Sequence, residues 1–184
     1  MQSASKLNTT YIKEKKIKFF VPFLFYLIGL ACYLSTLMPY IESLMTSRLP
    51  KNVLSNVSHL DYIIICIGFL LLILGFFVES FIMFLASNFL GAGVKYRAFL
   101  TLFTFSNLPI ALKFIVISVK NVIIDQPVTY LIFKQNNPLI TFFDLFNICY
   151  MVLLFLLVKN HTNLNNNVKL GILLLISLIY RLVF

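Results

Sequence analysis

The chain consists largely of long apolar runs, and these runs limit what it can fold into more than any other feature. Several are as long as the ~20 residues that a helix needs to cross a bilayer. Of the 184 residues, 60% are apolar and only 11% are charged, whereas a soluble domain has about 25% charged residues. Together with a mean hydropathy of +0.95, this composition excludes a water-soluble globular protein and leaves no segment long enough for a soluble catalytic domain.

The apolar runs predict an all-α fold, an integral membrane bundle of five transmembrane helices. Residues 1–18 form the expected basic cytoplasmic N-terminal segment, and residues 19–184 form the transmembrane domain. The expected spans are residues 19–40, 61–90, 99–124, 139–158 and 168–184. The first run is longer than the ~7–15 apolar residues at the centre of a signal peptide, so we expect it to stay uncleaved.

The orientation follows from the positions of Lys and Arg, because cytoplasmic loops carry an excess of both. With the N-terminus inside, nine bases fall on the inner side and five on the outer side, and Lys113, within a span, is left out. The inner bases are Lys6, Lys13, Lys15, Lys16, Lys18, Lys95, Arg97, Lys159 and Lys169. The outer bases are Arg48, Lys51, Lys120, Lys134 and Arg181, the last close to the outer end of the fifth span. We therefore expect a multi-pass cell-membrane protein with a cytoplasmic N-terminus and an extracellular C-terminus.

The formal charge of +9 does not indicate nucleic acid as a partner. A nucleic-acid site needs a basic patch on a water-facing surface, and here the bases lie in short segments between apolar runs. No nucleic-acid partner is expected.

Enzyme signatures are missing from the sequence. The two histidines, His59 and His161, fall on opposite sides of the membrane in this topology, and no H-E-x-x-H, G-x-S-x-G or Walker motif occurs. Cys32, Cys66 and Cys149 lie in three different spans without a metal-ligand spacing. We therefore predict that the protein is not an enzyme and has no catalytic, cofactor-binding or metal-binding residue.

A short inner turn connects the second and third spans. Gly91 and Gly93 follow the second apolar run, and Lys95 and Arg97 come directly after them. Glycine adopts the left-handed backbone conformation that ends many helices without steric cost. Gly91-Ala92-Gly93 is therefore expected to be a helix C-cap, and it is too short to cradle a phosphate.

Polar groups at membrane depth are the most informative residues. Glu79 lies in the second span, and Asn107, Pro109 and Lys113 lie in the third. A charge at that depth costs at least ~2.5–3.5 kcal/mol on insertion scales, so it usually faces protein, water or a partner. These four residues are therefore candidates for helix packing or partner contact. Two alternatives stand for the charged ones: Glu79 and Lys113 form an intramembrane pair, or each side chain reaches its own headgroup layer.

Proline predicts the shape of the third span. Because Pro109 has no amide hydrogen and its ring clashes with the preceding turn, we expect a kink between about Phe105 and Pro109.

Four short motifs occur in order along the second to fourth spans. They are the glycine turn Asn88–Gly93, the basic-aromatic link Lys95–Phe99, the pattern Phe105-Ser106-Asn107-Leu108-Pro109 and the segment Phe143–Ile148. In these motifs the chain resembles the YIP family, the Ypt-interacting five-span membrane proteins with an inner N-terminus and an outer C-terminus. The resemblance is to the bacterial branch of the family.

The resemblance implies a function. Bacterial members of the family resemble accessory membrane subunits, and some are associated with MacAB-like ABC exporters that give resistance to antimicrobial peptides. It therefore implies a non-enzymatic scaffold subunit that assists such an exporter in peptide-toxin export or self-protection. The expected partners are the lipid bilayer and other membrane proteins such as ABC exporter subunits. The alternatives are a stand-alone bacteriocin immunity protein, whose partner is a hydrophobic peptide, and a small membrane transporter.

The nine-to-five division of bases makes a direct topological prediction. Alkaline phosphatase, which is active only outside the cytoplasm, is expected to be active when fused after Phe184 and inactive when fused after Arg97. The reverse pattern would contradict the predicted orientation.

Overall fold

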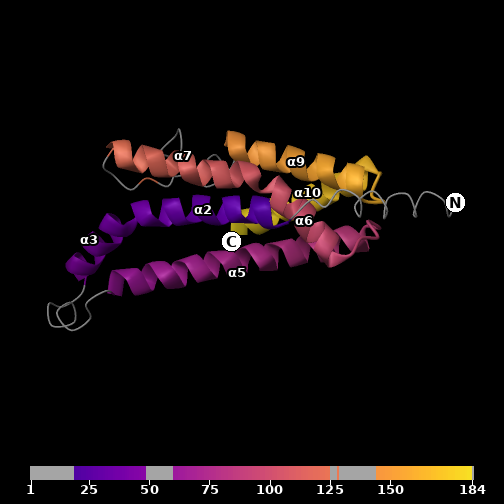
Figure 1. Cartoon of the computed structure of the whole chain (residues 1–184). Coiled ribbons are helices and arrows are strands. Elements are labelled where there is room, and N and C mark those ends of the chain that lie inside the picture. The colour runs from indigo at the N-terminus through magenta and orange to yellow at the C-terminus, as the bar shows by residue number, and fades with distance from the viewer. Residues whose placement is uncertain (1–18, 49–59, 125–127, 129–143, 184) are drawn as a thin grey trace.

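The computed structural model describes residues 19–48, 60–124, 128 and 144–183, and the regular structure within them is entirely helical (Figure 1). The predicted N-terminal segment, residues 1–18, lies outside the described residues. The helices are α2 (Phe20–Thr36), α3 (Met38–Arg48), α5 (Leu60–Phe89), α6 (Tyr96–Ser106), α7 (Leu108–Ile124), α9 (Leu145–His161) and α10 (Asn167–Val183).

Two of the helical runs are long and apolar enough to cross a membrane, Tyr62–Phe89 in α5 and Tyr96–Ile124 across α6 and α7. A third candidate span results if α2 and the first part of α3 count as one bent helix, and α9 is a shorter apolar helix. The all-α class is thus confirmed, with two to three candidate spans.

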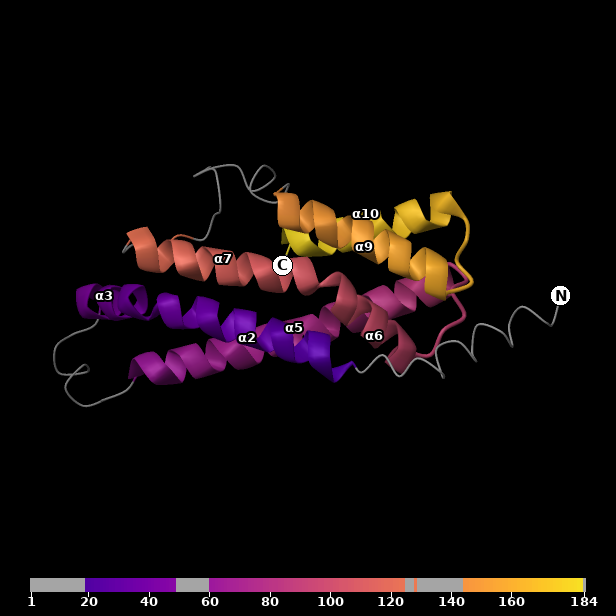
Figure 2. The same cartoon turned by 45° about the horizontal axis from the view of Figure 1, so that its top comes forward.

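Proline interrupts the first and third predicted spans at equivalent positions. The first run is not the single helix expected over residues 19–40, because α2 ends at Thr36 and the chain bends by 41° into α3. Pro39 lies two residues beyond the break at Leu37, as Pro109 lies two residues beyond the break at Asn107. In both places the proline ring clashes with the turn before it. The expected interruption of the third span is confirmed, and Figure 2 shows α6 and α7 running in different directions.

The last two helices form a hairpin at one end of the bundle. α9 begins later than the expected residue 139, because Asp144 caps it: the side chain accepts a hydrogen bond from the Asn147 amide at 2.8 Å. Residues 139–143 and residue 184 of the predicted spans lie outside the described residues. In Figures 1 and 2 the end of α10 lies beside the middle of α5.

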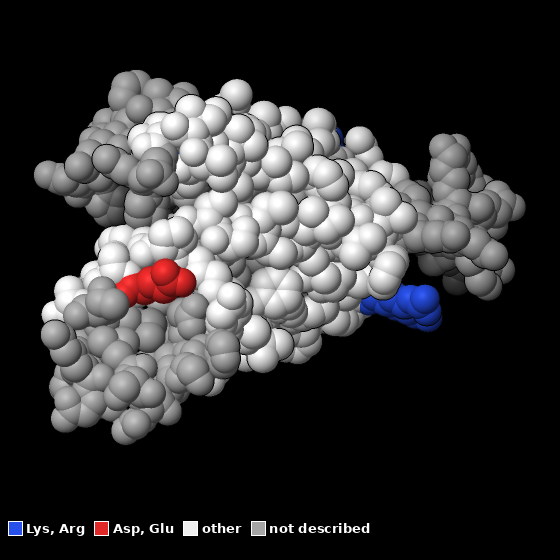
Figure 3. Space-filling view, turned by 60° about the vertical axis from the view of Figure 1, so that its left-hand side comes forward, with Lys and Arg blue, Asp and Glu red and all other residues white. Residues whose placement is uncertain are grey.

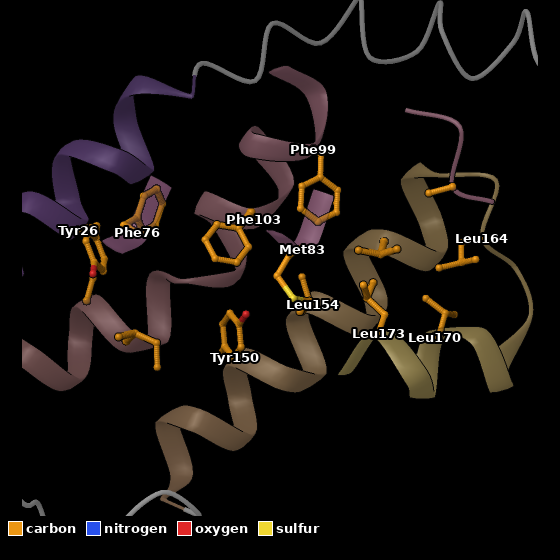
Figure 4. Close-up of a cluster of buried hydrophobic side chains, with 14 of the residues drawn as sticks. Tyr26, Phe76, Met83, Phe99, Phe103, Tyr150, Leu154, Leu164, Leu170 and Leu173 are labelled. Atoms are coloured by element: carbon orange, nitrogen blue, oxygen red, sulfur yellow. The ribbon is translucent and has the colours of Figure 1, made fainter. Parts of the chain in front are cut away.

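The core is formed where these helices meet. α2 packs along α7 more extensively than any other pair of described helices. Aromatic and aliphatic side chains from α5, α6, α9 and α10 fill the space beyond that pair (Figure 4). The fully buried members include Met83, Phe99, Phe103, Tyr150, Leu154 and Leu173.

The outer surface is apolar. On α5 many large side chains point outward, among them Leu70 with 65% and Leu74 with 59% of its area exposed. On the face shown in Figure 3, most of the surface between an acidic patch at one end and a basic patch at the other is uncharged. An apolar exterior around buried polar groups is the arrangement that hydrocarbon surroundings favour.

Gly29 sets the distance between α2 and α7. A Cβ at this position would lie 2.6 Å from the backbone oxygen of Ala111, which cannot move aside without shifting α7. We expect Gly29→Ala to lower the free energy of unfolding by about 1–3 kcal/mol, the usual cost of overpacking. Unfolding in mixed detergent micelles measures it.

The matched control is Gly68→Ala on α5, where a Cβ would meet nothing within 4 Å. There alanine is expected to be neutral or to stabilise the helix by about 0.5–1 kcal/mol. Equal effects of the two substitutions would contradict the close packing of α2 on α7.

Candidate functional site

Five polar side chains from four parts of the fold meet at the centre of the bundle, and we call them the central polar cluster. The members are Glu79 of α5, Asn107 at the break between α6 and α7, Tyr150 of α9, and Ser177 and Arg181 of α10. Within α5, Glu79 lies roughly 15 Å along the helix axis from the C-terminal end at Phe89.

Arg181 is the centre of the cluster. Its Nε donates to Glu79 Oε1 at 2.6 Å, and its Nη2 donates to Glu79 Oε2 at 3.4 Å and to Asn107 Oδ1 at 2.6 Å. Only 13% of the Arg181 side chain and 11% of the Glu79 side chain are exposed. A planar guanidinium binds a carboxylate through two of its nitrogens, which a lysine cannot do.

Tyr150 closes the cluster from α9. Its ring lies 3.6 Å below the guanidinium carbon of Arg181, a cation–π contact. Its hydroxyl is 2.9 Å from Ser177 Oγ and donates to Glu79 Oε1 at 3.4 Å. The ring is fully buried beside Phe103 (Figure 4), so the hydroxyl has its partners within the protein.

Local structure brings Asn107 and Ser177 to the guanidinium. Asn107 lies at the break before Pro109, and its Nδ2 donates to the Phe103 carbonyl at 2.9 Å, which leaves Oδ1 directed at Arg181. Ser177 and Arg181 are four residues apart on α10, so they lie on the same face of that helix. The proline-induced break is therefore what presents an amide side chain to the buried charge.

Lys113 forms a separate ion pair with Asp144, at the start of α9. The pairing of Glu79 with Lys113, one of the two alternatives drawn from the sequence, is not found: the counter-ion of Glu79 is Arg181 of α10, and that of Lys113 is Asp144. Asp144 is also the N-cap of α9, so the pair ties α7 to the start of α9.

The glycine turn after α5 is a helix C-cap, as expected. Gly91 has a φ of +103°, the Ala92 amide donates to the Ser87 carbonyl at 2.9 Å and the Gly91 amide to the Asn88 carbonyl at 3.0 Å. These two bonds define a Schellman motif. Gly93 also has a positive φ, +62°, and a Cβ there would lie 3.0 Å from Asn163 Nδ2 in the turn between α9 and α10.

The turn after α5 and the turn between α9 and α10 are joined by a hydrogen bond. The Asn163 amide donates to the Ala92 carbonyl at 3.0 Å, and the Asn88 side chain bonds both the amide and the carbonyl of Val94, each at 3.0 Å. Lys95 and Arg97 follow on α6 and are exposed. The structure thus places these two bases at the surface and the glycines at the packed turn.

Three members of the central polar cluster were missed from the sequence: Tyr150, Ser177 and Arg181. Arg181 was placed near the outer end of the fifth span because it is close to the C-terminus. One signal was present, since Arg181 is the only base in the second half of the last apolar run and Ser177 lies one turn before it. Glu79 and Asn107 were found because their polarity stands out in apolar runs.

The polar groups of the central polar cluster bind one another. In the described part of the chain, no buried side-chain nitrogen or oxygen lacks a hydrogen-bond partner. The same residues contain no group of three or more metal-ligating side chains. Breaking such a buried ion pair by removing one partner leaves an uncompensated charge, so the two partners are coupled.

Two shallow apolar grooves lie on the outer surface beside α2. One, of about 370 Å³, lies against α6 and α7 near their break and is lined by Val21, Pro22, Phe25, Phe105, Leu108 and Leu112. The other, of about 340 Å³, lies between α2 and α7 and includes Cys32, Ser118 and Val122. Neither groove includes a member of the central polar cluster.

Comparison with known proteins gave no match: no protein-family model, no curated protein and no solved structure matches the chain.

The buried ion pair predicts strong coupling between α5 and α10. Arg181→Leu leaves the Glu79 carboxylate buried without its counter-ion, so we expect a loss of about 3–5 kcal/mol in the free energy of unfolding. Glu79→Leu should cost a similar amount. The double variant Glu79→Leu/Arg181→Leu should cost less than either single one, because no unpaired charge remains. Additive single effects, measured by unfolding in bicelles, would contradict the pairing.

Proposed function

We propose that the chain is a five-span membrane protein of the bacterial branch of the YIP family. In this proposal its N-terminus is cytoplasmic and its C-terminus extracellular. It is a non-enzymatic accessory or scaffold subunit that assists a MacAB-like ABC exporter in peptide-toxin export or self-protection. The motifs of the second to fourth spans support the family, and the arrangement of charged and apolar groups supports the mode of action.

The helix lengths are compatible with five spans. α9 and α10 have 17 residues each, about 25 Å along the axis, within a few ångströms of a ~27–30 Å hydrocarbon core. α2 with α3 accounts for the first span, and α5 and α6–α7 account for the next two. The turns at Gly91 and Asn163 then lie on the cytoplasmic side.

The observation that carries the proposal is that the buried polar groups bind one another while the exterior is apolar. Glu79, Asn107 and Lys113 have partners within the chain, and Pro109 shapes the break that positions Asn107. These candidates for partner contact therefore support the protein's own fold. In a membrane, helices associate through close packing of such faces, so an apolar exterior supports a contact with other membrane proteins.

α5 is the face best suited to such a partner. It is the longest and most apolar described helix, and 17% of its apolar window is buried, against 56% for the run across α6 and α7. Leu70 and Leu74 lie four residues apart on its exposed side. The scaffold role thus assigns the contact with an exporter subunit to the middle of α5.

The test is co-purification from the native host after mild crosslinking. Leu70→Trp/Leu74→Trp enlarges the proposed contact face, so we expect the yield of co-purified ATPase and permease to fall at least about tenfold, the effect of a lost interface anchor. The matched control is Leu175→Trp/Ile179→Trp, the same change one turn apart on the exposed side of α10. It should leave the yield unchanged.

The stand-alone immunity function makes the opposite prediction. Expressed in a toxin-sensitive host that lacks the exporter, the chain should give no resistance if it is an accessory subunit. Full resistance there, with no ATPase or permease recovered in the native host, would contradict the proposed function.

A further inference from the structure

One end of the bundle carries a cluster of basic side chains, which we call the basic end. It is the end where the turn at Gly91 packs on the turn at Asn163, through the hydrogen bond from the Asn163 amide to the Ala92 carbonyl. Its members are Lys95, Arg97, Lys159 and Lys169. Figure 3 shows a small protruding group of basic atoms at one end of the molecule, beyond the uncharged band.

Two of these ammonium groups are held in place by the fold. Lys169 Nζ donates to the Leu90 carbonyl at 2.9 Å, at the C-terminus of α5. Lys159 Nζ donates to Asn167 Oδ1 at 3.1 Å and lies 5.4 Å from the centre of the Phe155 ring. An ammonium has three donor hydrogens, so each retains donors for an external acceptor. Little side-chain freedom remains to be lost when such an acceptor binds.

The other two bases lie at the end of a helix that repels them. Lys95 is the N-cap of α6 and Arg97 is its second residue, and both are exposed. The N-terminus of a helix carries partial positive charge, which favours anions and disfavours cations. The first turn of α6 contains no acidic residue, so an anion from outside the chain would relieve this repulsion.

The described acidic residues do not neutralise the basic end. Glu42 lies in α3 and Asp61 in the first turn of α5, both at the opposite end of the bundle (Figure 1). Glu79 and Asp144 are paired with Arg181 and Lys113. The positive charge of the basic end therefore has no counter-charge among the described residues.

We propose that the basic end binds the phosphate groups of anionic phospholipids. Its bases lie within the first or last three residues of α6, α9 and α10 or directly beside them. In a membrane-spanning arrangement helix ends lie at the depth of the headgroups, and basic groups between or beside membrane helices favour anionic lipid headgroups. A headgroup brings acyl chains that cover the adjoining apolar surface, which an acidic soluble protein does not. The inference rests on the membrane-spanning arrangement and is independent of the exporter role.

The test compares lipids by thermal unfolding of the full chain in a neutral detergent. Short-chain phosphatidylglycerol is expected to raise the Tm at a concentration at least about tenfold lower than phosphatidylcholine, and added salt should reduce the difference. The variant Lys95→Gln/Arg97→Gln/Lys159→Gln/Lys169→Gln should lose this preference. Lys120→Gln, at the opposite end, is the control and should retain it.

Three results would overturn the proposal. An equal response of the wild-type chain to both lipids would exclude a headgroup site. An equally strong response to inorganic phosphate would assign the site to the free anion, and a stronger response to a poly-glutamate peptide would assign it to an acidic protein.

Flotation with liposomes checks separately that the fourfold variant inserts into membranes. If it does not insert, the lipid preference of the wild-type chain decides the test. Loss of exporter co-purification with retained lipid preference would contradict only the proposed function.

Discussion

A guanidinium group that is largely buried within a helix bundle needs partners within the protein, because an unpaired buried charge is costly. Arg181 does so by contacting α5, the break between α6 and α7, and α9 at once, through Glu79, Asn107 and the ring of Tyr150. Removing any one of these partners exposes the cost of burying the others. This side chain is therefore one of the groups that join the C-terminal hairpin to the rest of the bundle, beside the Lys113–Asp144 pair and the apolar core.

The ion pairs also determine what the outside of the protein can do. Glu79 and Lys113 are both paired within the chain, the outward side of α5 is apolar, and Lys95, Arg97, Lys159 and Lys169 lie at the basic end. An apolar exterior favours packing against other membrane helices, and a basic end favours phosphate groups.

Features set by local chemistry could be predicted from the sequence. Length and hydropathy placed α5 within a residue of its observed bounds, Gly91 marked a C-cap, and Pro109 marked an interruption. Pro39 carried the same signal two residues after Leu37, but the apolar run around it favoured a single helix. The start of α9 was set by the Asp144 cap, which a hydropathy pattern does not register.

The pairing of charges could not be predicted in this way. Glu79 and Arg181 are 102 residues apart, and which helices lie side by side depends on packing that no local pattern encodes. An arginine near the end of the last apolar run is also compatible with a second placement, in which its long side chain extends the guanidinium to the membrane interface. Only the angular position of Ser177 and Arg181 on one helix face pointed to a shared polar surface.

The contact between Arg181 and Glu79 in a lipid bilayer tests the account most directly. Solid-state NMR on the labelled protein in bilayers measures whether the guanidinium nitrogens of Arg181 are close to the carboxyl carbon of Glu79 or to lipid phosphorus. We expect a strong dipolar coupling to the Glu79 carboxyl carbon and none to phosphorus. A coupling to lipid phosphorus without one to Glu79 would show that Arg181 reaches the headgroups, and would contradict the central polar cluster.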